Sequence, residues 1–258
     1  MYYLSANCYF VFSQSHKHSW LSPYSYCQWN PLGRADPSGA LDSDHIDVFG
    51  NVIAHYDDGD KSVYVHKYGT TKSQVDAQRT ASNNTGGSGS KIGEIGGNID
   101  VSGIMTNKLK VSTTVAKGLG ISGYFNAVKP GAIWDLKNNK NTIFGVAWAY
   151  DGDNGSKTTF SFGSYTNMSA ADVGNYHAGY TGRYTYNGEG MSYNLLWRGA
   201  GAAETAKSIT EFRLLDAVRQ TFEIFGNGIV PSLPPYGDRV PDFIWNTAGM
   251  IDADKNKK

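Results

Sequence analysis

Cysteine is scarce in this chain: its 258 residues include two cysteines, Cys8 and Cys27, both close to the start. A disulfide framework needs several cysteine pairs, and a cysteine zinc site needs closely spaced ligands. We therefore expect neither feature. The later region is free of cysteine and can fold in a reducing or an oxidising compartment.

Long apolar runs and an excess of charge are also missing. No stretch approaches the ~20 apolar residues of a membrane-spanning helix, so no membrane span is expected. The apolar start includes Asn7 and Cys8 and has no basic segment or small-residue cleavage site. It is therefore not typical of a signal peptide, and export would depend on another component. The 23 Lys and Arg residues balance 23 Asp and Glu residues, which argues against a protein that coats nucleic acid.

Residues 43–69 have the pattern of a β-hairpin. Two alternating runs, 52–56 and 62–66, flank an Asp-Asp-Gly-Asp turn, and Asp-Gly turns favour hairpins. His55 and His66 could face each other across it. No further ligand accompanies them, so no metal site is expected there.

Residues 70–98 are rich in Ser, Thr, Asn, Gly and Gln. This composition is typical of a flexible linker and marks the clearest domain boundary in the sequence. Its glycines do not predict a phosphate loop, because no strand leads into them and no Gly-Lys-Ser/Thr follows.

Residues 99–258 show mainly helical periodicity. Helices are predicted at 99–117, around 170–182, after Ser192, at 209–225 and from Pro241 onward. The alternating runs 142–150 and 158–165 predict one β-hairpin, joined by an acidic turn that lacks the register and the distal glutamate of a calcium loop. The predicted fold class is α+β: a mainly α-helical C-terminal domain with one β-hairpin, after a short β-rich N-terminal segment and a flexible linker.

The helix that follows Ser169 holds the principal candidate residue. Three glycines inside this segment cost about 1 kcal/mol each relative to alanine, which suggests close approach of another backbone or of a ligand. His177 is the one histidine after His66, and histidine is the side chain suited to acid–base chemistry near neutral pH. The alternative is a histidine that is satisfied within a helix-packing interface.

Polar residues interrupt the apolar sequence at three places, one of which includes His177. They are Trp134-Asp135-Leu136-Lys137, Asn175-Tyr176-His177 and the segment from Arg198 to Glu204, with Asp238 at a predicted helix start as a weaker candidate. Asp135 and Lys137 could also form a surface ion pair of little energetic weight. Trp134 and Tyr176 could stack on a base, or they could belong to the core.

The order and spacing of these elements resemble the bacterial toxin 44 family (polymorphic toxin type 44). The resemblance covers roughly residues 101–251 and rests on four elements in order. These elements are Gly131–Lys137, Gly174–Gly182, Leu195–Glu204 and Gly237–Gly249. The chain departs from the family pattern at Ala178, where an aromatic residue is common.

The start of the chain has a resemblance of its own. Tyr24-Ser25-Tyr26, Asn30-Pro31 and Asp36-Pro37-Ser38-Gly39 resemble the last segment of an Rhs/YD-repeat-associated core, which closes a β-cage and precedes a variable toxin. Residues 1–42 are therefore interpreted as a remnant of such a core, and 99–258 as the toxin domain.

The resemblance implies a C-terminal toxin of interbacterial competition, delivered into the cytoplasm of a target bacterial cell, with ribonuclease activity proposed for the family. Its implied partners are an RNA substrate, a cognate immunity protein, and a full-length Rhs cage or secretion apparatus. Metal-free RNA cleavage needs a base, an acid and a cation for the phosphate. The predicted catalytic residues are His177, Asp135, Lys137 and Glu204; the predicted substrate-binding residues are Asn175, Arg198, Trp134, Tyr176 and Asp238. No metal or other cofactor is expected.

Two other functions fit the same residues. Asp135 and Glu204 could form the carboxylate pair of a hydrolase for another polymer such as peptidoglycan. A non-enzymatic binding module, in which the glycines serve helix packing alone, is the third reading.

Overall fold

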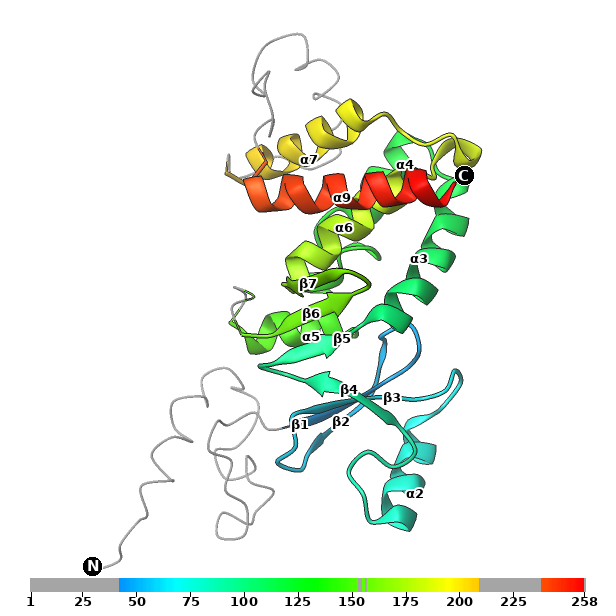
Figure 1. Ribbon diagram of the computed structural model, residues 1–258, viewed down its shortest axis with the longest axis vertical. Helices are drawn as coiled ribbons and strands as arrows, with labels where there is room; N and C mark the ends of the chain where they lie inside the picture. Colours follow the sequence, from blue (N-terminus) through cyan, green and yellow to red (C-terminus); the bar gives the residue numbers. More distant parts are fainter. Residues whose placement is uncertain (1–41, 153–154, 156, 209–237, 258) are drawn as a thin grey trace, which may run out of the picture. The chain divides into compact units, whose positions relative to one another are not determined.

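The computed structural model describes residues 42–152, 155, 157–208 and 238–257, and these residues fall into two compact units. Unit 1 consists of the described residues up to Asp47 together with Val52–Ile95, and unit 2 consists of Val48–Asn51 and the described residues from Gly96 onward. Both units mix helices and strands (Figure 1). The region interpreted as an Rhs-core remnant and the predicted helix 209–225 lie outside the described residues, apart from residue 42.

Unit 1 is a small sheet with one helix. The strands stand in the order β2-β1-β3-β4, and the elements are β1 (Asp42–Ile46), β2 (Val52–Asp57), β3 (Ser62–Val65), α2 (Lys72–Ser82) and β4 (Ser90–Glu94). β1 pairs with β2 in antiparallel fashion and with β3 in parallel fashion. The predicted hairpin between 52–56 and 62–66 is therefore wrong, because the chain crosses from β2 to the far side of β1.

The expected flexible linker, residues 70–98, is also wrong. Thr71 and Gln74 form a capping box at the start of α2, and Asn83 ends the helix in the left-handed conformation. Val75, a residue of α2, is fully buried. β4 then pairs with β3. Local caps and pairing with a distant strand give order to a polar segment whose composition alone indicates a linker.

Unit 2 is mainly helical and begins with a short strand. Its elements are β5 (Asn98–Asp100), α3 (Ser102–Lys117), α4 (Ile121–Val128), η2 (Leu136–Asn138), α5 (Ile143–Tyr150), β6 (Thr159–Phe162), β7 (Tyr165–Met168), α6 (Ala170–Gly182), η3 (Tyr186–Gly188), α7 (Tyr193–Ser208) and α9 (Val240–Asn256). The predicted helices at 99–117, 170–182, after Ser192 and from Pro241 correspond to α3, α6, α7 and α9.

The predicted hairpin of unit 2 is misplaced. Residues 143–150 form helix α5, whose first turn is capped by the Thr142 hydroxyl bound to the Gly145 amide. The antiparallel pair is β6 with β7, and β6 also pairs in parallel with β5. The Asp151 carboxylate accepts hydrogen bonds from Lys157 N at 3.1 Å and Thr158 N at 2.8 Å, so it closes the acidic turn. The described part of the chain is thus a mixed α and β structure, in which unit 2 is mainly helical.

Helix α6 is the packing centre of unit 2, and its closest neighbour is α9 (Figure 1). The two backbones meet at glycines. A Cβ atom added at Gly179 would lie 2.0 Å from the Asn246 carbonyl oxygen, and one at Gly249 would lie 2.1 Å from that of Tyr176. These distances leave no room for a side chain. The close approach that the costly glycines of α6 suggest is confirmed for Gly179, and the neighbour is a helix backbone.

Candidate functional site

Helix α6 carries His177 and Asn175 and has a well-defined start. The Ser169 hydroxyl accepts from the Asp172 amide at 3.2 Å, and the Asp172 carboxylate accepts from Ser169 N at 2.8 Å. This capping box satisfies amide groups that a helix start leaves unpaired. It fixes the register with which the helix presents His177.

His177 is completely buried. Its Nε2 atom hydrogen-bonds the Ser112 hydroxyl of α3 at 2.9 Å, and the Trp134 ring contacts its imidazole edge to face at 5.6 Å. Its Nδ1 atom is buried and has no hydrogen-bond partner. Burial, with a smaller effect of the Lys108 charge, lowers the pKa of His177 to about 3.

This environment defines the chemistry that His177 can perform. With a pKa of about 3 the imidazole is neutral at pH 7 and cannot act as a general acid. It can accept a proton at Nδ1 only where a substrate reaches that buried atom. A phosphate beside the ring would favour the imidazolium and raise the pKa. In the observed arrangement His177 joins α3, α6 and the Trp134 segment.

The Trp134–Lys137 element divides its side chains between different neighbours. Trp134 points into the core and contacts His177. Asp135 Oδ2 accepts from Gly131 N and from Asn138 Nδ2, both at 2.7 Å, and so closes its own turn. The Lys137 ammonium lies 5.2 Å from the centre of the Trp148 ring. Trp134 is therefore the member of this element that meets His177.

A second polar group links α6 with the start of α9. Asn175 Nδ2 donates to Asp242 Oδ1 at 2.8 Å, and Arg239 Nε and Nη2 lie 2.9 Å and 2.8 Å from Asp242 Oδ2. The Arg239 side chain is 58% exposed and that of Asp242 is 12% exposed. Asp238 accepts from the Arg239 amide at 2.9 Å. A carboxylate thus orients an arginine side chain that is more than half exposed, an arrangement suited to an anionic substrate.

The side chains of Tyr176 and Arg198 have hydrogen-bond partners outside this group. The Tyr176 hydroxyl donates to Asp252 Oδ2 at 3.1 Å, and burial, together with the Asp252 charge, raises its pKa. Arg198 Nε donates to Asn194 Oδ1 at 2.6 Å within α7. Glu204 belongs to α7, but its side chain lies outside the described part of the structure. No common site with His177 is therefore observed for Tyr176 and Arg198.

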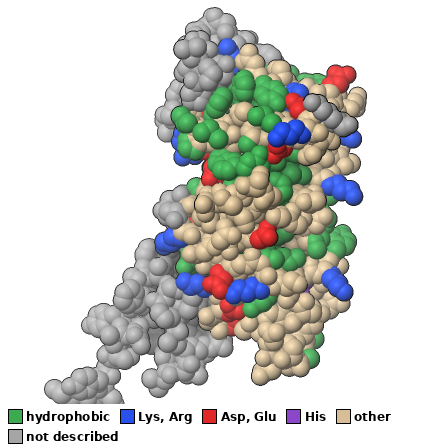
Figure 2. All heavy atoms as spheres, in the orientation of Figure 1, with side chains coloured by type: hydrophobic (Ala, Val, Ile, Leu, Met, Phe, Trp, Pro, Cys, Tyr) green, Lys and Arg blue, Asp and Glu red, His purple; other side chains and the backbone are tan. Residues whose placement is uncertain are grey.

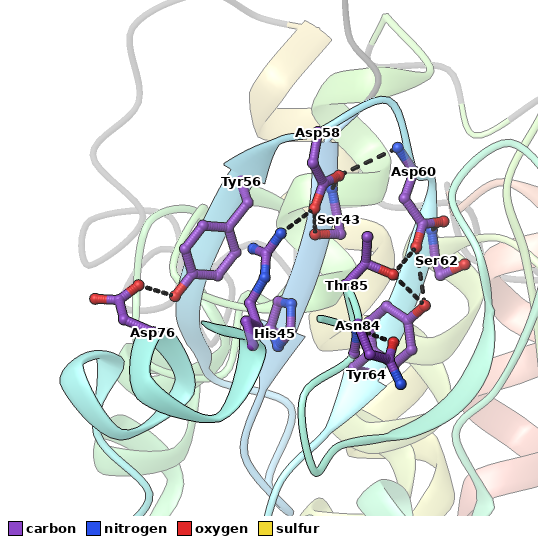
Figure 3. A network of polar contacts seen from close by, with 12 residues as sticks. Ser43, His45, Tyr56, Asp58, Asp60, Ser62, Tyr64, Asp76, Asn84 and Thr85 are labelled. Atoms are coloured by element: carbon purple, nitrogen blue, oxygen red, sulfur yellow. Dashed lines mark hydrogen bonds and ion pairs between the residues drawn. The ribbon is translucent and has the colours of Figure 1, made fainter. Parts of the chain in front are cut away.

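Unit 1 contains a polar cluster that the sequence reading missed (Figure 3). His45 Nδ1 and His66 Nε2 are 2.7 Å apart, and the two side chains are 0% and 3% exposed. The parallel pairing of β1 with β3 brings the two histidines together. His55, which was expected opposite His66, instead pairs with Asp44. The sequence shows His45 and His66 next to apolar residues. To predict that these two histidines meet, the order of the strands in the sheet must be known.

No cluster of three or more His, Cys, Asp or Glu side chains that could hold a metal ion is present among the described residues. None of the helices described combines the length and the apolar composition needed to cross a membrane.

Comparisons with known proteins give no family assignment: no protein-family model, no curated protein and no solved structure matches the chain.

Proposed function

We propose that this chain is the C-terminal part of a bacterial polymorphic toxin, with unit 2 as the effector module, and that the module is a ribonuclease. The observation that supports the proposal is the convergence of the motif elements on α6. Trp134 contacts His177, Gly249 abuts Tyr176, and Asn175 bonds Asp242. These residues come from three of the four elements on which the resemblance rests.

The fourth element packs on the same assembly. Trp197 Nε1 donates to the Thr247 hydroxyl at 2.9 Å, which joins α7 to α9. Motif elements that are far apart in sequence thus form one connected structure. Such convergence is expected of a functional module and is not required of unrelated polar islands.

The proposed mechanism uses the exposed Arg239 to bind an RNA phosphate, with Asp242 and Asn175 to orient it. RNA binding must first displace the neighbouring groups that bury the Nδ1 atom of His177. The imidazole then serves as the general base for a 2′-hydroxyl. The phosphate charge raises the pKa of the imidazole at that moment. The 2′-oxygen displaces the 5′-oxygen from phosphorus, water supplies the proton to the leaving 5′-oxygen, and the products are a 2′,3′-cyclic phosphate and a 5′-hydroxyl.

The second candidate is a non-enzymatic module, and the complete burial of His177 favours it. In that case the Ser112–His177 hydrogen bond and the glycine contacts serve packing alone. Hydrolysis of another polymer such as peptidoglycan is the third candidate. Of its carboxylate pair, Asp135 closes its own turn and the side chain of Glu204 lies outside the described part of the structure, so no specific observation favours it.

The test incubates the full chain with labelled tRNA and, separately, with peptidoglycan. The variants are His177→Gln, Arg239→Gln and the control Lys255→Gln, which removes one positive charge from the other end of α9. We expect cleavage of tRNA by the wild type and by the control, and a loss of about 100-fold or more in the His177 variant. Inactivity of the wild type on both polymers, or full activity of a folded His177→Gln protein, would refute the proposed ribonuclease.

The proposed partners have a test of their own. A toxin requires an antidote in the cell that produces it, so we propose a cognate immunity protein, and an Rhs cage or secretion apparatus for delivery into the target cytoplasm. Co-expression with the product of the adjacent coding region should restore bacterial growth and give a complex on purification. Growth that is unaffected by the full chain in the cytosol would contradict this proposal.

A further inference from the structure

The buried His45–His66 pair of unit 1 is independent of the proposed toxin chemistry. The two imidazoles share one hydrogen bond of 2.7 Å, and His45 also stacks on Tyr64 and meets Tyr56 edge to face. Figure 3 shows His45 between these two tyrosines. The contacts hold the rings in one orientation.

The outer nitrogens of the pair are buried and unpaired. They are His45 Nε2 and His66 Nδ1. When both rings are neutral, one outer nitrogen carries a hydrogen and the other does not, whichever ring donates in the shared bond. An added proton must therefore occupy one of these buried outer nitrogens, where Asp58 and the Thr85 backbone favour it less than burial, His66 and Arg79 oppose it. Most of its charge would be buried without compensation.

The charged groups around the pair cannot readily relieve this charge. Burial is the largest cause that lowers the pKa of His45 to about 4; the charges of His66 and of Arg79 in α2 lower it further, and Asp58 and the Thr85 backbone act in the opposite direction. Asp58 already binds Arg79 Nη2 at 2.5 Å and Ser43 Oγ at 2.7 Å. Asp60 accepts from Tyr64 at 2.8 Å and Thr85 at 3.0 Å.

The remaining neighbours are similarly engaged. Asp76 of α2 accepts from the Tyr56 hydroxyl at 2.6 Å and from Lys72. Asp44 and His55 pair with each other on β1 and β2. Every carboxylate in this group thus has a partner that protonation of the pair would have to displace.

Helix α2 depends on the same cluster. The Arg79 guanidinium stacks 3.7 Å from the centre of the Tyr56 ring while it binds Asp58, and these contacts hold α2 to the sheet. The segment after α2 packs directly on the pair, because a Cβ atom at Gly89 would lie 2.7 Å from His66 Nε2. A positive charge on the pair repels Arg79 and disturbs both contacts.

We propose that the His45–His66 pair is an acid-sensitive switch, which releases α2 and the segment that follows it from the sheet when the pH falls from neutral to about 5. Above pH 7 both rings are neutral and the unit is closed. Acidification favours the open form, in which each imidazole is hydrated and can take up a proton freely.

Hydrogen exchange of the full chain tests this proposal. A histidine that titrates near 6.5 when open and near 4 when closed makes the opening equilibrium constant rise about tenfold between pH 7.5 and 5.5. After correction for the intrinsic exchange rate, amides of 72–82 should lose about tenfold in protection over this range. Amides of α3 in unit 2, measured in the His177→Gln variant so that this residue contributes no acid response of its own, should change by less than twofold.

The matched variants are His45→Gln and His66→Gln, with His55→Gln as the control on the same sheet. The first two should abolish the acid response of α2, and the control should keep it. Should either buried variant fail to fold, NMR titration of the wild type decides: His45 should remain neutral above pH 5 in the closed form. A wild-type change below twofold, an unaltered acid response in both buried variants, or titration of both imidazoles near 6.5 in the closed form would overturn the proposal.

Discussion

Ser112 and His177 form a hydrogen bond of 2.9 Å between α3 and α6 in the interior of unit 2. Ser112→Ala would leave His177 Nε2 buried without a partner, which costs about 1–3 kcal/mol. We expect this loss in the free energy of unfolding, measured with urea. Thr114→Ala, a change in the same helix at an exposed residue, should cost less than ~0.5 kcal/mol. Equal effects of the two substitutions would show that the buried bond contributes little.

The glycines of α6 should respond to alanine in opposite directions. Gly179→Ala places a methyl group against the Asn246 carbonyl and should cost several kcal/mol, because α9 would have to move. A Cβ atom at Gly174 meets nothing within 4 Å, so Gly174→Ala should stabilise the helix by up to ~1 kcal/mol. Thermal unfolding of both variants measures this difference. A stable Gly179→Ala protein would contradict the close crossing of the helices.

Acid should destabilise unit 2 through His177. The folded-state pKa of about 3 lies below the ordinary value of 6.5, so the neutral ring contributes its full stability above pH 6.5 and loses it as the pH falls toward 3. His177→Gln removes this dependence. In the variant, the free energy of unfolding of unit 2 should vary less between pH 6.5 and 4 than in the wild type. Identical pH profiles would indicate that His177 is accessible and titrates normally.

The His55–Asp44 pair should act in the opposite direction. The hydrogen bond to Asp44 is the main cause that raises the pKa of His55 above 6.5. The His55–Asp44 pair therefore stabilises the fold fully below pH 6.5, and this stabilisation is lost as the pH rises through the folded-state pKa of His55. His55 is partly exposed, so the effect should be about 1 kcal/mol or less. Urea unfolding of His55→Gln from pH 5.5 to 8.5 should show it; an equal loss at both ends of this range would count against the ion pair.

The helices of unit 2 were the part of the fold most accessible to sequence analysis. Ser169 and Asp172 give a local start signal, and the cost of glycine at position 179 pointed to a close backbone contact. Residues 143–150 were misassigned because their aromatic and β-branched residues alternate as in a strand. The Thr142 cap and the contacts of unit 2 favour a helix there, and tertiary contacts override propensity.

The candidate sites depended more strongly on long-range pairing. The sequence identified His177 but could not show that its side chain is buried behind Trp134. Asp242 was present in the closing motif, yet its role emerged when Asn175 and Arg239 were found beside it. The His45–His66 contact could not be predicted, because it requires β3 to pair with β1 rather than with β2.

The glycine crossing of α6 and α9 makes the end of the chain indispensable to the middle. With backbones in direct contact, the two helices cannot slide or rotate past each other without a steric clash. Shortening the protein before Gly249 would strip α6 of the surface that shields Tyr176 and Gly179 from water. A truncated product should therefore lose the packing of α6, although α6 itself is complete in sequence.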